Sequence, residues 1–110
     1  MAIAEPHEEE IKVINVEDLI RQTFPEAPDT MVSVANCESG LKQFDSRGQV
    51  ITSHTKDFGI LQINEKFWDL KAKELGLDYK GSLEDNLKMA RHIYDVQGKK
   101  AWVCYQKMIK

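Results

Sequence analysis

The sequence predicts a mainly helical single domain with one small β-hairpin or loop between its second and third helices. Its 110 residues suffice for one hydrophobic core, since two separate cores would each be too small to hold together. Apolar residues recur at helical spacing in four segments, each with recognisable capping residues. Residues 41–57 lack that period and contain an S-R-G turn between β-branched pairs, which is typical of a hairpin or loop.

The first helix is predicted from residue 16 to residue 24. Asn15 can cap it, because a side-chain oxygen at that position accepts the free amide protons of the first turn. Pro25 ends it, since proline lacks the amide proton that the next turn would need. The preceding residues 1–14 are polar and acidic and predict a flexible lead-in to a single domain over residues 15–110.

The second helix is predicted over residues 31–39, with Asp29 or Thr30 as its cap and Gly40 as its left-handed stop. The stretch MVSVA gives it a broad apolar stripe. Glu38 therefore lies in the last turn of a largely buried helix. The helix dipole is negative there and water is scarce, so Glu38 is predicted to hold a proton.

The stretch KDFGILQIN, residues 56–64, is an apolar run interrupted by polar side chains. A run this apolar is expected to be buried, so Gln62 and Asn64 must find hydrogen-bond partners or face a cleft. Gly59 permits a close approach of another chain segment or an unusual backbone dihedral.

Two further helices follow. Asn64 can cap a third helix over residues 65–75, which Gly76 closes. Ser82 and Asp85 form a capping box for a fourth helix over residues 83–97, which Gly98 stops. The predicted inner face of the third helix consists of Phe67, Trp68, Ala72 and Leu75. The predicted core stripe of the fourth consists of Leu83, Leu87, Ala90, Ile93 and Tyr94.

Composition excludes several function classes. The net charge is −3 and the pI is about 5.6, whereas binding to nucleic acid or to an anionic membrane surface requires a basic face. No apolar run approaches the roughly 20 residues that a membrane-inserted helix needs. The amino end shows no export signal, so the protein is either intracellular or a mature domain whose leader is absent from this chain.

Two cysteines, Cys37 and Cys104, lie far apart in the chain, and the three histidines do not cluster with them, so we expect no metal site. The cysteines are either two buried thiols or one disulfide. A disulfide would close a loop of 67 residues, worth roughly 4 kcal/mol of stability. The sequence favours the disulfide, which implies an oxidising compartment.

Five stretches are informative in combination: CESG at 37–40, LKQFDSRGQ at 41–49, DFGILQIN at 57–64, EDNLKMARHIYDVQG at 84–98 and AWVCY at 101–105. Together they resemble the lysozyme-like superfamily, in particular its soluble lytic transglycosylase (SLT) type. The resemblance covers most of residues 29–105. It implies a small α+β lysozyme-like fold and a muramidase-like enzyme that cleaves the β-1,4 bond between N-acetylmuramic acid and N-acetylglucosamine in peptidoglycan.

The resemblance implies that Glu38 is the general acid and base. A carboxyl group kept protonated by an apolar pocket is the established feature of lysozyme, a member of the superfamily that the sequence resembles. Asp57 occupies the position of the second acid of animal-type lysozymes, and its alternative interpretation is a turn aspartate. With Asp57 as nucleophile or charge stabiliser, water would complete a hydrolysis. Without it, Glu38 would activate the C6 hydroxyl of the sugar and give a 1,6-anhydro product.

Four other residues match substrate-side or positioning groups of the family. Gln62 and Asn64 would bind substrate, although Asn64 is also a plain helix cap. Tyr94 would hydrogen-bond the catalytic glutamate, or serve as a core aromatic. Ser39 would orient the glutamate, or help to end its helix.

Since the motifs other than Asp57 resemble the transglycosylase branch, we expect the anhydro-forming reaction, with the lysozyme-type hydrolase as the alternative. A third interpretation is a non-catalytic glycan-binding or wall-assembly module on the same fold. We expect a monomer that acts on a peptidoglycan glycan strand outside the cytoplasm, without cofactor or metal.

Overall fold

The computed structural model describes residues 15–108, and the predicted lead-in over residues 1–14 lies outside them. Helices dominate, as predicted, and a single two-stranded sheet accompanies them in the described part of the chain. The elements are α1 (Val16–Thr23), α2 (Pro28–Ser39), β1 (Asp57–Phe58), β2 (Ile63–Asn64), α3 (Glu65–Leu75), α4 (Leu83–Gln97), the 3-10 helix η2 (Lys99–Ala101) and α5 (Val103–Met108).

The first two helices follow their predicted signals, with one correction. The Asn15 side chain accepts the amide proton of Glu17 at 2.8 Å, which confirms the cap of α1. Helix α2 begins at Pro28, earlier than predicted, with Ala27 and not Asp29 or Thr30 at its cap. The fixed φ of a proline suits the first helical position, which explains the earlier start. Gly40 ends α2 at φ 72°, as predicted.

Side-chain caps also begin the next two helices. Asn64 accepts the amide proton of Phe67 at 3.1 Å, and Ser82 accepts that of Asp85 at 3.1 Å. The predicted capping box of α4 is only half formed. Its second half is replaced, because the carboxylate of Asp85 accepts the amide proton of Asp78 at 2.9 Å.

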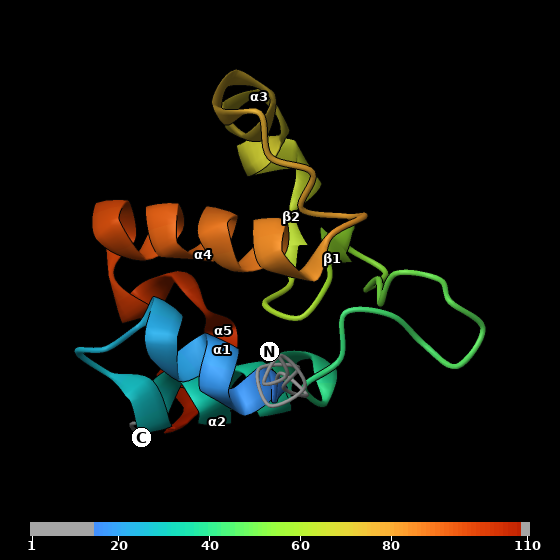
Figure 1. The fold of residues 1–110 in the computed structure, drawn as a ribbon. Coiled ribbons are helices and arrows are strands. Elements are labelled where there is room, and N and C mark those ends of the chain that lie inside the picture. The colour runs from blue at the N-terminus through green and yellow to red at the C-terminus, as the bar shows by residue number, and fades with distance from the viewer. Residues whose placement is uncertain (1–14, 109–110) are drawn as a thin grey trace, which may run out of the picture.

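The predicted inner face of α3 is wrong in part. Ala72 is buried and Trp68 half-buried, but the side chains of Phe67 and Leu75 are 73% and 46% exposed. Figure 1 shows the reason: α3 stands apart from the helical group and adjoins β2, so only a narrow strip of it is covered. In the same view α4 runs between α1, α2 and α5 on one side and the small sheet with α3 on the other.

The β structure is smaller than a full hairpin and lies later in the chain than predicted. Residues 41–56 contribute only isolated bridges, Phe44 with Val50 and Thr52 with Phe58. The paired strands are β1 and β2, which run antiparallel with Asp57 opposite Asn64. The stretch KDFGILQIN therefore forms both strands and the turn between them, residues 59–62.

The polar backbone of this turn is satisfied by a fully buried side chain from α4. The Asn86 amide oxygen accepts the amide proton of Leu61 at 3.0 Å. Its nitrogen donates to the carbonyl oxygens of Phe58 and Tyr79, both at 2.9 Å. Since each buried polar group left unpaired would cost about 1–3 kcal/mol, Asn86 anchors the turn to α4.

Gln43, in the loop after α2, also forms hydrogen bonds with the backbone of this turn. Its amide oxygen accepts the amide proton of Ile60 at 2.9 Å, and its nitrogen donates to the carbonyl oxygens of Tyr79 and Lys80 at 3.0 and 3.2 Å. Gln43 is only 5% exposed, so these bonds are made where water does not compete. The turn is thus held between the loop after α2 and the start of α4.

Gly59 makes this arrangement possible. Its φ is +82°, and a Cβ atom at this position would lie 2.6 Å from the amide of Gln43 and closer still to that of Asn86. No other residue fits without displacing the two amides that hold the turn.

We predict that Gly59→Ala lowers the free energy of unfolding by about 2–4 kcal/mol, because overpacking and a left-handed alanine both oppose the fold. Gly48→Ala is the matched control: its φ is +80°, but nothing lies within 4 Å of the added Cβ, so the loss should be about 1 kcal/mol. Urea unfolding of both variants measures the difference. Equal losses would contradict the crowding of Gly59.

Candidate active site

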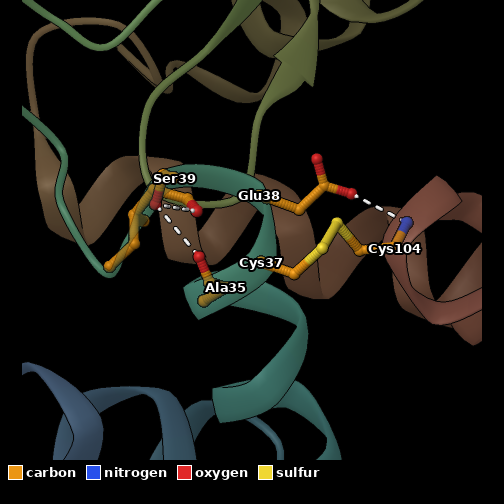
Figure 2. Close-up of a disulfide and its surroundings, with 6 residues drawn as sticks. Ala35, Cys37, Glu38, Ser39 and Cys104 are labelled. Atoms are coloured by element: carbon orange, nitrogen blue, oxygen red, sulfur yellow. Dashed lines mark hydrogen bonds between the residues drawn. A yellow bond between two sulfur atoms is a disulfide. The ribbon is translucent and has the colours of Figure 1, made fainter. Parts of the chain in front are cut away.

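Glu38 lies in the last turn of α2 and is half-buried. Its Oε2 accepts the backbone N–H of Cys104 at 3.3 Å, as Figure 2 shows. Burial raises the pKa of Glu38, and the negative charge of Asp57 raises it further, against the lowering effects of the Cys104 amide and Lys107. The environment at the end of α2 therefore shifts the pKa of Glu38 upward, the direction expected from the sequence.

The disulfide between Cys37 and Cys104 is formed, which resolves the two alternatives left open by the sequence. It joins α2 to α5 across a sequence separation of 67 residues. Cys37 directly precedes Glu38, so the covalent bridge and the acid occupy adjacent positions on α2 (Figure 2).

Ser39 links the end of α2 to the turn described above. Its hydroxyl lies 2.8 Å from the carbonyl oxygen of Ile60 and 3.1 Å from that of Ala35, and its oxygen accepts the amide proton of Lys42 at 3.2 Å. A hydroxyl group has one proton, so the two carbonyls share it. Ser39 thus ends the helix and fixes the position of the turn relative to the segment that carries Glu38.

Asp57 has the opposite environment to that of Glu38. Burial opposes its ionisation, but hydrogen bonds from Thr55 at 2.5 Å, Asn64 at 2.9 Å and Ser53 at 2.7 Å prevail and lower the pKa of Asp57. Three donors fix this carboxylate in place and leave it ionised at neutral pH. The pKa values of the two carboxyl groups are therefore shifted in opposite directions.

A cavity of about 510 Å³ opens beside Asp57, a volume suited to a small-molecule ligand or a short stretch of polymer. Segment 57–64 and the start of α3 form part of its wall, and α4, η2 and Trp102 form another part. The lining residues are Asp57, Gln62, Ile63, Asn64, Phe67, Trp68, Ile93, Gln97, Ala101 and Trp102. Glu38 is not among them, and its connection to this wall is the negative charge of Asp57, which raises the pKa of Glu38.

Two of the predicted binding residues, Gln62 and Asn64, do line the cavity, but they also hold its wall. The Gln62 amide donates to the carbonyl oxygens of Gly59 and Ile51 at 2.9 and 3.2 Å. Asn64 both caps α3 and donates to Asp57. Each side chain is therefore positioned before any ligand arrives.

Tyr94 is not brought to the acid. The Tyr94 ring packs against the Phe24 ring, with 5.3 Å between the ring centroids. The Arg91 guanidinium lies 5.1 Å from the centroid of the Tyr94 ring. Among the described residues it makes no hydrogen bond to Glu38, so its environment is that of a core aromatic.

Three residues that shape the site were not predicted to do so. Gln43 and Asn86 hold the turn, and the buried indole of Trp102 donates to the carbonyl oxygen of Leu61 at 2.8 Å. A signal for Asn86 existed: it is a polar residue on the apolar face of its helix, where a buried amide must be paired.

No protein-family model matches this chain, and searches of curated proteins and of solved structures found no match either. Among residues 15–108, no helix combines the length and the apolar character that crossing a membrane requires. No group of three or more His, Cys, Asp and Glu side chains in that range is arranged to hold a metal ion.

The opposite pKa shifts of Glu38 and Asp57 predict opposite effects of pH on the free energy of unfolding. The folded pKa of Glu38 is raised, so its favourable contribution is present below the unfolded pKa and is lost as pH rises through the folded pKa. Glu38→Gln should therefore match the wild type near about pH 4 and exceed it near about pH 8, by up to about 1 kcal/mol after solvent screening.

Asp57→Asn should behave in the reverse sense. The folded pKa of Asp57 is lowered, so its contribution is present above the unfolded pKa and is lost as pH falls through the folded pKa. We expect this variant to be about 1 kcal/mol less stable near neutral pH and to approach the wild type in acid. Urea unfolding across this pH range measures both variants, and parallel pH profiles would rule out the assigned protonation states.

Proposed function

We propose that this protein is a peptidoglycan-cleaving glycosidase of the lysozyme-like superfamily. It would act on the β-1,4 bond between N-acetylmuramic acid and N-acetylglucosamine. One observation carries the proposal: a half-buried glutamate with a raised pKa is electrostatically coupled to an ionised aspartate on the wall of a cavity. The motifs that hold these residues are those whose resemblance to the superfamily was noted from the sequence.

In this reaction Glu38 donates its proton to the glycosidic oxygen as the bond breaks. The sugar then develops positive charge at its anomeric carbon. Asp57, held by Ser53, Thr55 and Asn64, needs no rearrangement to stabilise that charge. After proton donation Glu38 is the base that activates the second nucleophile.

That nucleophile decides the product. The motifs resemble the lytic transglycosylase branch, in which the C6 hydroxyl of the sugar attacks and a 1,6-anhydro end forms. The ionised Asp57 on the cavity wall favours the alternative, a lysozyme-type hydrolysis in which water attacks. Both reactions use Glu38 in the same way.

The disulfide supports a location outside the cytoplasm, because such bonds persist in oxidising compartments. Peptidoglycan lies there as well. The net charge of −3 means that the glycan strand would be held by shape and hydrogen bonds more than by charge attraction. We propose that the protein acts as a monomer.

Glu38→Gln should reduce the release of soluble fragments from purified peptidoglycan by at least about 10²-fold, because glutamine has no proton to donate. Binding to soluble muropeptides, measured by calorimetry, should persist, since glutamine keeps the shape of the side chain. Asp18→Asn, an exposed change at the start of α1, is the matched control and should leave both unchanged. A wild-type protein that binds muropeptides and never cuts them would instead be a non-catalytic glycan-binding module.

Mass spectrometry of the fragments distinguishes the two reactions, because an anhydro end is lighter than a hydrolysed end by one water molecule. Asp57→Asn extends the test. If Asp57 takes part in hydrolysis, this variant should lose turnover by about 10²-fold or more. If the product is the anhydro sugar and the variant keeps its rate, Asp57 serves only to hold the loop that contains Ser53 and Thr55.

A further inference from the structure

Two connections between α2 and α5 converge on the acid. The first is the Cys37–Cys104 disulfide, with the Cα atoms 6.0 Å apart. The second is the hydrogen bond from the backbone N–H of Cys104 to Oε2 of Glu38, at 3.3 Å. Since Cys37 and Glu38 are neighbours in the chain, the two connections close one small ring, visible in Figure 2. While the disulfide is intact, the Cys104 amide must stay close to the carboxyl group of Glu38.

The Cys104 amide is available for this bond because it lies in the first turn of α5. The first amides of a helix have no acceptor within the helix and must find one elsewhere. Glu38 supplies that acceptor, so the acid and the start of α5 satisfy each other.

Helix α5 depends on external attachments. It has six residues, and a helix of that length is not stable by itself in water. Its main contacts are to α2 and η2, while Val103 and Met108 are 59% and 45% exposed. The disulfide is the covalent attachment, and the bond from the preceding Trp102 to Leu61 fixes the chain just before the helix.

We propose that the Cys37–Cys104 disulfide is a positioning element for the acid, and that its reduction to two thiols releases α5 and opens Glu38 to water. Cys37 and Cys104 are positioning residues in this proposal, which rests on the proposed function for its catalytic meaning. Cys37 is exposed, so a dithiol reductant can reach the bond. The reductant supplies two electrons and two protons, the S–S bond breaks, and the dithiol leaves as its own disulfide.

The consequence for Glu38 has a definite direction. Burial is the largest cause of its raised pKa, and the opposing bond from Cys104 is smaller. Departure of α5 removes the bond from Cys104 and the smaller lowering effect of Lys107, and it exposes Glu38 to water, so the loss of burial lowers the pKa of Glu38 toward its ordinary value. A reduced enzyme would then hold a smaller protonated fraction of Glu38 at a given pH, and so less of its proton donor.

The test is an NMR pH titration of the Glu38 carboxyl carbon in ¹³C-glutamate-labelled protein, with its signal assigned by its loss in Glu38→Gln. It compares the oxidised wild type, the wild type with dithiothreitol, and the Cys37→Ser, Cys104→Ser double variant. We expect the midpoint to shift to lower pH in both disulfide-free forms. We also expect the lytic rate at pH 7 to fall relative to the rate at pH 5.

Arg91→Ala is the control for general loosening. Arg91 holds Glu26 and Asp95 at 2.7 and 2.8 Å, so its loss weakens the fold away from the acid and leaves the disulfide intact. Its Glu38 midpoint should equal that of the wild type. An equal shift in Arg91→Ala, an unshifted midpoint without the disulfide, or outright unfolding of both disulfide-free forms where Arg91→Ala stays folded would overturn the proposal.

The titration needs no substrate, so the two proposals can fail separately. A shifted midpoint in a protein that never cuts peptidoglycan overturns the proposed function and leaves the disulfide as a positioning element for Glu38. A reduced enzyme that cuts at the same rate with an unshifted midpoint overturns the positioning role alone.

Discussion

The structure depends on the hydrogen bonds that pair the backbone groups of the turn between β1 and β2. One backbone hydrogen bond lies within this turn, from the N–H of Gln62 to the carbonyl oxygen of Gly59 at 3.0 Å, and side chains from outside the turn pair the backbone groups of Ile60 and Leu61. The side-chain oxygens of Asn86 and Gln43 accept the amide protons of these two residues. The side chains of Ser39 and Trp102 donate to the carbonyl oxygens of Ile60 and Leu61. Because these donors and acceptors come from different elements, the turn fixes the relative positions of α2, α4 and the chain entering α5. The cavity wall and the end of α2 are placed by the same bonds.

The candidate site rests on a contrast between two carboxyl groups. Glu38 is half-buried and receives a single amide proton, while Asp57 receives three hydrogen bonds at the cavity wall. Burial sets the direction of the pKa shift of Glu38, and hydrogen bonding sets that of Asp57. The proposed reaction needs this contrast, because one group would donate a proton while the other would stabilise a cation at the same pH.

Helix ends could be predicted from the sequence because their signals are local. Asn15, Gly40 and Ser82 act within a few residues of their own positions. The exposure of Phe67 could not be predicted, because it depends on which elements lie opposite α3. The contact of Glu38 with Cys104 joins residues 66 apart, and no rule about neighbouring residues gives it. Glu38 was predicted as the acid from the motif around it, whereas its hydrogen-bond partner could be found only from the fold.

The disulfide also has a topological consequence. Residues 46–49 form an exposed tip in the loop between α2 and β1, where proteases commonly cut. This tip lies inside the segment that Cys37 and Cys104 enclose. A chain cut there stays one covalent molecule, because the disulfide joins the two fragments. All the helices that line the cavity lie on the same fragment, after the cut.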